Sequence, residues 1–217
     1  MRAGAPAVIW VMAGLFVAIE AILAASDIGL IRPGLRFAAY RLFAFHDVVF
    51  EAWRSGQDVG PLFYLTFVSH AFFHGGFLHL AMNTVVFLAL GAHLSRAVGE
   101  AATMLLFFGT AAGGALCFGL MADTGLQFVP MVGCSGALFG FLGAMKRWEW
   151  RYVRAHGLST RRFWGTILGL VLINLLLSLG SLGGGGVAWE AHLGGFIAGW
   201  LAGGALTPRR GAAIGPI

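Results

Sequence analysis

The stretch 132-VGCSGALFGFLGA-144 places a serine between glycines inside a run that carries no charge. Gly136, Gly140 and Ala144 recur every fourth residue, so a helix here presents small residues along one face. Small residues let helix backbones approach closely inside lipid. The stretch therefore predicts a tightly packed membrane helix. It leaves open whether Ser135 only packs there or acts as a nucleophile.

The composition of the whole chain supports a membrane protein. Of 217 residues, 59% are hydrophobic and only 11% are charged, whereas a soluble domain averages about a quarter charged residues. The net charge of +5 could indicate nucleic acid, but the basic residues gather between apolar runs and are better explained as topology signals. Cys117 and Cys134 do not make a disulfide framework, and we interpret them as small buried hydrophobes. We predict one polytopic membrane domain over residues 1–217 and no nucleic-acid partner.

Six apolar segments are long enough to suggest transmembrane helices. They cover roughly residues 6–25, 77–95, 101–121, 131–147, 164–181 and 188–206. The segment 26–76 carries charges of both signs and several aromatic residues, so it fits a long interfacial loop with short helices rather than a span. The first segment is too long for the apolar part of a typical signal peptide, and we expect it to be a retained helix.

The basic residues predict the orientation of these spans. Of the 14 Lys and Arg residues, ten fall on the side that also holds both termini: Arg2, Arg96, Lys146, Arg147, Arg151, Arg154, Arg161, Arg162, Arg209 and Arg210. The other four lie within 26–76 among acidic residues. We therefore expect both termini in the cytoplasm and the 26–76 loop on the outer side.

Several polar residues fall at membrane depth, where they are costly and by default mark function or an internal partner. Counted from the outer ends of their spans at 1.5 Å per residue, His79 and Asn83 lie about 5 and 10 Å deep, and Ser135 and His192 about 7 Å deep. The topology came from loop charges alone, so this common depth is independent of it. It favours a shared site over separate packing roles.

The residue types at that depth suit acyl-transfer chemistry. A neutral histidine within about 3 Å could take the proton of Ser135, and His192 is the sole histidine of the last three segments. Gly195 and Gly199 follow His192 at i+3 and i+7, which predicts close packing against the helix that carries Ser135. His79 and Asn83, four residues apart, can both donate hydrogen bonds to an oxyanion.

Three motifs together resemble the rhomboid family of intramembrane serine proteases. They are 133-GCSGALFG-140, 70-HAFFHGGFLHLAMN-83 and 189-WEAHLGGFIAG-199, and they occur in the family's order. The resemblance covers nearly the whole chain and implies an all-α bundle of six transmembrane helices with a long interfacial loop between the first two spans.

The resemblance also implies a role for each matching residue. Ser135 is then the nucleophile and His192 the general base of a dyad, and the oxyanion is stabilised by His79, Asn83 and the backbone N–H of Ser135. The further positions that fall into structural places near the site are His70, His74, Gly133, Gly136, Phe139, Gly195 and Gly199. No cofactor or metal is implied.

The chain departs from the family pattern at two places. Many members have a tyrosine that stacks on the catalytic histidine where this chain has Phe139, which keeps the ring without the hydroxyl. Many also have Trp-Arg shortly before the first histidine of the second motif, where this chain has Leu65 and Thr66. The second departure affects the expected packing of the loop and not the expected chemistry, and the effect of Phe139 stays open.

Other interpretations of the polar residues remain. His79 and Asn83 could be a structural clamp, and His70 and His74 could be metal ligands, although no Cys or acidic ligand stands near them. We interpret Asn174 as a residue that holds helices together, and Glu20 stays unexplained. For the whole chain, the alternatives are an inactive rhomboid-like protein that binds membrane clients and, in a different class, a transporter with a polar pathway.

The predicted activity is peptide-bond hydrolysis near the outer leaflet, and the resemblance implies single-span membrane proteins as substrates. Water would reach Ser135 from the outside, and the substrate helix would have to unwind before its peptide bond is accessible. The short loops suggest a bacterial inner membrane, with the active site open to the periplasm. The sequence does not indicate an oligomeric state.

Overall fold

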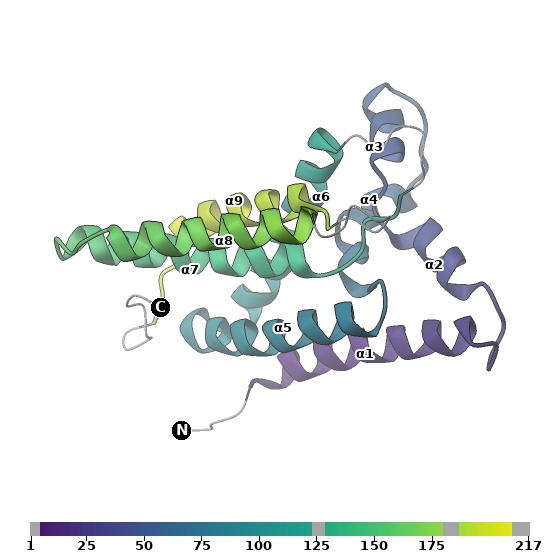
Figure 1. The fold of residues 1–217 in the computed structure, drawn as a ribbon, viewed down its shortest axis with the longest axis horizontal. Coiled ribbons are helices and arrows are strands. Elements are labelled where there is room, and N and C mark those ends of the chain that lie inside the picture. Colours follow the sequence, from purple (N-terminus) through teal and green to yellow (C-terminus); the bar gives the residue numbers. More distant parts are fainter. Residues whose placement is uncertain (1–4, 123–128, 180–186, 210–217) are drawn as a thin grey trace.

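The computed structural model describes residues 5–122, 129–179 and 187–209, and over these residues the fold is built from helices joined by short non-helical segments. Three long helices come from the first half of the chain: α1 (Ala7–Asp27), α5 (Phe77–Val98) and α6 (Glu100–Met121). The second half supplies α7 (Ser135–Ala155), α8 (Arg161–Leu179) and α9 (Trp189–Ala205), which run side by side (Figure 1). A helix therefore lies at each of the six apolar segments.

Three of these helices, α1, α5 and α6, are long and apolar enough to cross a membrane. The apolar surface of α1 shows why: Ile9, Phe16 and Leu23 face the core, while Trp10 and Leu15 on the other side stay exposed. A helix that is apolar on nearly all sides and only one-third buried by protein fits a lipid environment. That the remaining helices also span the bilayer stays a prediction.

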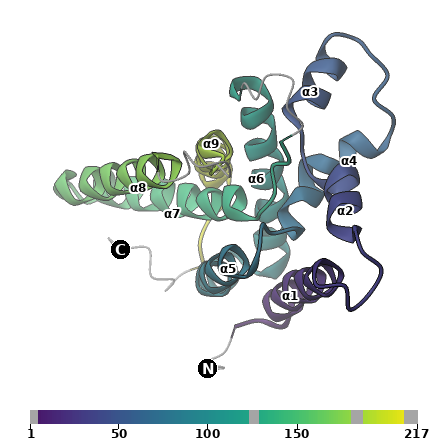
Figure 2. The same cartoon turned by 45° about the vertical axis from the view of Figure 1, so that its right-hand side comes forward.

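The segment between α1 and α5 folds into short helices. These are α2 (Leu35–Phe43), α3 (Asp47–Arg54), α4 (Leu62–Ser69) and the 3-10 turn η1 (His70–Phe72). Figure 2 shows α6 standing between these short helices and the group formed by α7, α8 and α9. An aromatic cluster around Phe45, Phe50 and Phe63 packs against Phe118 of α6 and fastens this segment to the bundle.

Glu20, which the sequence left unexplained, belongs to an ion pair between α1 and α2. Its carboxylate lies 2.8 Å from Arg36, and Arg36 also contacts Asp27 at 2.6 Å. Arg36 and Tyr40 in turn donate hydrogen bonds to the carbonyl oxygen of His74. The buried charge therefore links the first helix, the short helices and the loop that precedes α5.

Glycines set how closely the helices of the second half approach. A Cβ at Gly195 would overlap the carbonyl oxygen of Gly136, and one at Gly199 would overlap that of Gly140. On the other side of α9, a Cβ at Gly114 of α6 would lie 2.8 Å from the carbonyl oxygen of Ala191. The backbone of α9 is thus in contact with both α6 and α7, which places the site residues of α7 and α9 together.

Helix α7 differs at both ends from the fourth predicted span, residues 131–147. It begins at Ser135 rather than near residue 131, because Met131 pairs with Phe45 as an isolated antiparallel bridge. It also continues to Ala155, eight residues beyond the predicted end at 147. Lys146 and Glu149, one turn apart in α7, form a buried ion pair, so Lys146 lies inside the protein rather than in the basic loop.

Candidate active site

Ser135 is the first residue of α7, at the end of an extended segment. Gly133 has a φ of +114°, and its N–H donates to the carbonyl oxygen of His70 at 3.0 Å. A Cβ at Gly133 would lie 2.8 Å from the imidazole of His79, so this position needs glycine for its conformation and for space. The N–H groups of a helix's first turn have no partner within the helix, and that of Ser135 is one of them.

His192 of α9 reaches Ser135 directly. Its Nε2 lies 2.8 Å from the Oγ of Ser135, and 3% of the histidine is exposed to solvent. The two residues are 57 positions apart, and the glycine contacts between α7 and α9 bring them together. The distance is within the range for a hydrogen bond between a hydroxyl and an imidazole.

Two further side chains hold the His192 ring. The ring of Phe139, one turn after Ser135 on α7, stacks on it with centroids 4.3 Å apart and planes 7° from parallel. Asn174 of α8 places its Oδ1 2.6 Å from Nδ1, the nitrogen on the opposite side of the ring from Ser135. Both ring nitrogens of His192 therefore have polar partners.

His79 and Asn83 lie on α5, beside the segment that leads into Ser135. The Nδ1 of His79 accepts a hydrogen bond from the backbone N–H of Gly75 at 3.1 Å, which leaves the ring proton on Nε2. That Nε2 is the edge nearest Gly133, two residues before Ser135. Asn83 donates to the carbonyl oxygen of His79 at 3.0 Å. The structure thus brings both residues to the same end of α7 as Ser135.

Comparison with known sequences decides the family. The Rhomboid domain model matches residues 61–209, which include Ser135, His192, His79 and Asn83. The chain belongs to the rhomboid family.

Curated relatives are about one-third identical to this rhomboid over the residues that align. RHOMBOID-like protein 5 of Arabidopsis thaliana is 34% identical over 141 residues, which cover 63% of this chain and 42% of that protein. RHOMBOID-like protein 4 of the same plant is 36% identical over 131 residues, which cover 60% of this chain and 31% of that protein. Rhomboid protease GluP of Bacillus subtilis is 32% identical over 142 residues, which cover 64% of this chain and 25% of that protein. The aligned part thus makes up about half or less of these relatives.

The two loop histidines of this rhomboid lie in the protein interior behind the site. His70 has its Nε2 3.4 Å from the carbonyl oxygen of Ala111, and its own carbonyl accepts from Gly133. His74 is fully buried, with its Nε2 3.8 Å from the Sγ of Cys134. Both therefore contact residues 133–134, which lead into Ser135. Among residues 5–122, 129–179 and 187–209, no group of three or more His, Cys, Asp and Glu side chains could hold a metal ion.

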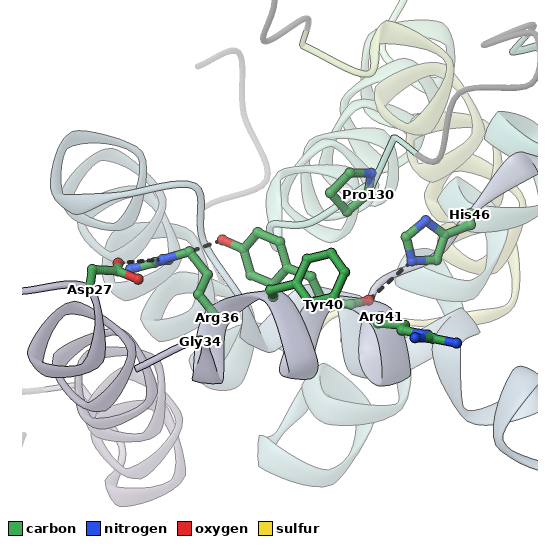
Figure 3. A pocket seen from close by; sticks show the side chains of 8 residues that line it. Asp27, Gly34, Arg36, Tyr40, Arg41, His46 and Pro130 are labelled. Atoms are coloured by element: carbon green, nitrogen blue, oxygen red, sulfur yellow. Dashed lines mark hydrogen bonds and ion pairs between the residues drawn. The ribbon is translucent and has the colours of Figure 1, made fainter. Parts of the chain in front are cut away.

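A separate cavity of about 390 Å³ opens beside α2 (Figure 3). Asp27, Arg36, Tyr40, His46 and Pro130 are among its lining residues, and neither Ser135 nor His192 is. The Arg36 side chain lies between Asp27 and Tyr40, and His46 contacts the carbonyl oxygen of Tyr40 at 3.0 Å. We place the candidate active site at Ser135 and His192, because the cavity has no nucleophile paired with a base.

Asn174 lies beside the candidate site, which the sequence interpretation did not predict. We interpreted it as a residue that holds helices together, and its side chain does contact another helix, at His192 of α9. Its depth in the membrane could have indicated this contact. Asn174 lies seven residues before the predicted outer end of its span at 181, which is about 10 Å deep and close to the depth of His192. The aromatic stack of Phe139 was expected from the resemblance, and the ring occupies that place.

Proposed function

We propose that this rhomboid is an intramembrane serine endopeptidase with Ser135 as nucleophile and His192 as general base. The observation that carries the proposal is the 2.8 Å separation between the serine Oγ and the histidine Nε2. A serine hydroxyl is a weak nucleophile until a base takes its proton, and a base at this distance can do so. The name of the related Bacillus subtilis protein, a rhomboid protease, agrees with this assignment.

The proposed reaction runs through an acyl-enzyme. Ser135 Oγ attacks the carbonyl carbon of the scissile peptide bond while its proton passes to Nε2 of His192. The histidine then gives that proton to the leaving amine, the C–N bond breaks, and the acyl group stays on the serine as an ester. Water attacks the ester, His192 takes the proton of the water, and the carboxylic product leaves as the proton returns to Ser135.

The oxyanion formed in this reaction needs donors that are already in place. We assign the backbone N–H of Ser135, the Nε2–H of His79 and the Nδ2 group of Asn83 to this task. The hydrogen bond from Gly75 holds His79 in the tautomer that donates, which supports the assignment. Removing one oxyanion donor lowers kcat by about 10²–10³-fold in serine proteases, so we expect His79→Ala and Asn83→Ala to be slow enzymes.

Substrates are proposed from the family and from the setting of the site. Ser135 is partly exposed at the N-terminal end of α7, which supports access by water and an unwound peptide. We propose single-span membrane proteins with a small residue before the cut, cleaved near the outer leaflet. Both termini of the enzyme would lie in the cytoplasm, and the site would open to the periplasm of a bacterial inner membrane.

The test is cleavage of a single-span substrate by the purified protein in detergent. Ser135→Ala and His192→Ala should lower kcat by about 10³-fold or more, and a fluorophosphonate probe should label native protein but not Ser135→Ala. Ser159→Ala, in the exposed connection between α7 and α8, and His93→Ala are matched controls away from the dyad and should cleave normally. Cleavage by Ser135→Ala at the native rate would refute the proposal. A native protein that binds the substrate, does not cut it and resists the probe would instead be an inactive client-binding protein.

A further inference from the structure

We propose that Asn174 is a positioning residue for His192, so that the site is a chain of three side chains from three helices: Ser135 of α7, His192 of α9 and Asn174 of α8. This inference rests on the proposed function, because it assigns Asn174 a part in making His192 a base. The contact that carries it is the 2.6 Å separation between the Oδ1 of Asn174 and the Nδ1 of His192.

The two contacts of the His192 ring together define its tautomer. A neutral imidazole has one protonated nitrogen and one nitrogen with a free lone pair. The amide oxygen of Asn174 only accepts hydrogen bonds, so the nitrogen facing it, Nδ1, carries the proton. The lone pair is then on Nε2, which faces the Oγ of Ser135 at 2.8 Å. This is the arrangement that a general base requires.

Burial makes the Asn174 contact necessary. Only 3% of His192 is exposed, so an N–H at Nδ1 has little access to water. A buried donor without a partner costs about 1–3 kcal/mol, enough to favour the other tautomer, which places the proton between the ring and Ser135. Asn174 removes that penalty. It also accepts from the imidazolium that forms when His192 takes the serine proton, and hydrogen bonds to charged groups are stronger than neutral ones.

The surroundings of Asn174 indicate a specific contact rather than general helix adhesion. Its neighbours on α8, Leu172, Ile173 and Leu175, are all exposed apolar residues, while Asn174 is half-buried. A strongly polar side chain on such a helix is costly unless it faces an internal partner. Phe139 covers a face of the same imidazole, so the stack and the amide together restrict rotation of the ring.

The experiment compares two replacements of Asn174 of similar size. Asn174→Leu removes the acceptor, and we expect kcat to fall about 10- to 100-fold with KM nearly unchanged. Asn174→Asp keeps an oxygen at the same place and should recover most of the lost kcat. Thr166→Val, which removes a hydroxyl elsewhere on α8, is the matched control and should act as native protein. If Asn174→Leu lowers the thermal stability, Asn174→Ala takes its place because it adds no bulk.

A second readout separates positioning from a merely structural role. Nitrogen-15 NMR of histidine-labelled protein distinguishes protonated from unprotonated ring nitrogens, and the His192 signals are found by their absence in His192→Gln. Native protein and Asn174→Asp should have the proton on Nδ1, and Asn174→Leu should lose that preference. Full kcat in Asn174→Leu, or a kcat loss with the tautomer unchanged, would overturn the inference.

The two proposals fail in different ways. If native protein does not cleave substrate and Ser135 resists the fluorophosphonate probe, the proposed protease activity is wrong. The NMR comparison still decides the role of Asn174 in that case, because it needs no turnover. A proton that moves from Nδ1 in Asn174→Leu supports the positioning role, and one that stays there refutes it.

Discussion

The imidazole of His192 is held on one face by an aromatic ring and on two edges by polar groups. Phe139 lies 4.3 Å away, nearly parallel to the imidazole. An aromatic pair of this kind contributes about 0.5–1.5 kcal/mol beyond its buried area. The stack fixes the plane of the ring, and only in that plane can its two nitrogens reach Asn174 and Ser135 at once.

We therefore expect Phe139→Leu to lower kcat by about 2- to 10-fold through a less ordered His192. Phe139→Tyr keeps the ring and adds the hydroxyl that many family members have, so it should retain activity. The measurement is kcat on the single-span substrate, with Phe77→Leu, at a position 82% exposed, as the control. Equal rates for Phe139→Leu and native protein would show that the stack does not order the base.

His46, outside the long helices, gives the folded protein a dependence on pH. It precedes α3 and is 4% exposed, and burial lowers the pKa of its imidazole, although hydrogen bonds to the backbone of Tyr40 and Val129 and the carboxylate of Asp47 oppose the shift. The unfolded chain, with an ordinary histidine pKa near 6.5, then takes up a proton at a higher pH than the folded chain does. His46 therefore leaves the free energy of unfolding unchanged above about pH 6.5. It lowers that free energy as the pH falls from there toward the lower pKa that His46 has in the folded protein.

The matching prediction compares melting temperatures at pH 7.5 and 5.5. Native protein should lose more thermal stability on acidification than His46→Gln, which does not titrate and can still donate to the carbonyl oxygen of Tyr40. Other buried histidines contribute equally in both proteins, so the difference between the two shifts reports on His46. Identical shifts would mean that His46 takes up its proton equally well in the folded and unfolded chains.

At the scale of the elements, the contact between α7 and α9 places Ser135, the proposed nucleophile, next to His192, the proposed base. Gly195 and Gly199 meet the carbonyl oxygens of Gly136 and Gly140, so the two backbones touch without side chains between them. A methyl group at either position of α9 would push the helices apart. The separation between Ser135 and His192 depends directly on this spacing.

Gly199→Ala should therefore destabilise the protein by about 1–3 kcal/mol and slow both substrate cleavage and fluorophosphonate labelling of Ser135. Gly165→Ala and Gly169→Ala on α8 are the controls, because nothing lies within 4 Å of a Cβ at either position. Those two variants should keep native activity and melt no lower than native protein. Normal labelling and stability in Gly199→Ala would contradict the role of the close contact.

The sequence predicted some of these elements better than others, for physical reasons. The four-residue spacing of glycines predicted the packing of α7 and α9 because helical periodicity is local. The start of α7 was not predictable from that pattern, since it depends on the pairing of Met131 with Phe45, 86 residues away, and on the room that Gly133 leaves for His79. The end of α7 was missed because charged residues suggested a loop, whereas Lys146 and Glu149 neutralise each other inside the protein.

At the scale of the whole molecule, the distribution of charge defines two ends. In the segment between α1 and α5, Arg36 forms ion pairs with Glu20 and Asp27, and Arg54 pairs with Glu51. This end therefore presents less positive charge than its arginine count suggests. The opposite end gathers most of the basic residues around the connection from α7 to α8. The asymmetry supports placing that end in the cytoplasm, since Lys and Arg near spans are retained there.

Single cysteines on opposite ends test this orientation in intact bacterial cells. In a Cys117→Ala background, Gln57→Cys, in the exposed turn after α3, should react with a membrane-impermeant maleimide. Ser159→Cys, in the exposed connection between α7 and α8, should react only after the cells are permeabilised. Cys134 is fully buried beside His74 and should contribute little background. The reverse labelling pattern would show that the topology is the opposite of the one predicted. The site of Ser135 and His192 would then open to the cytoplasm and not to the periplasm.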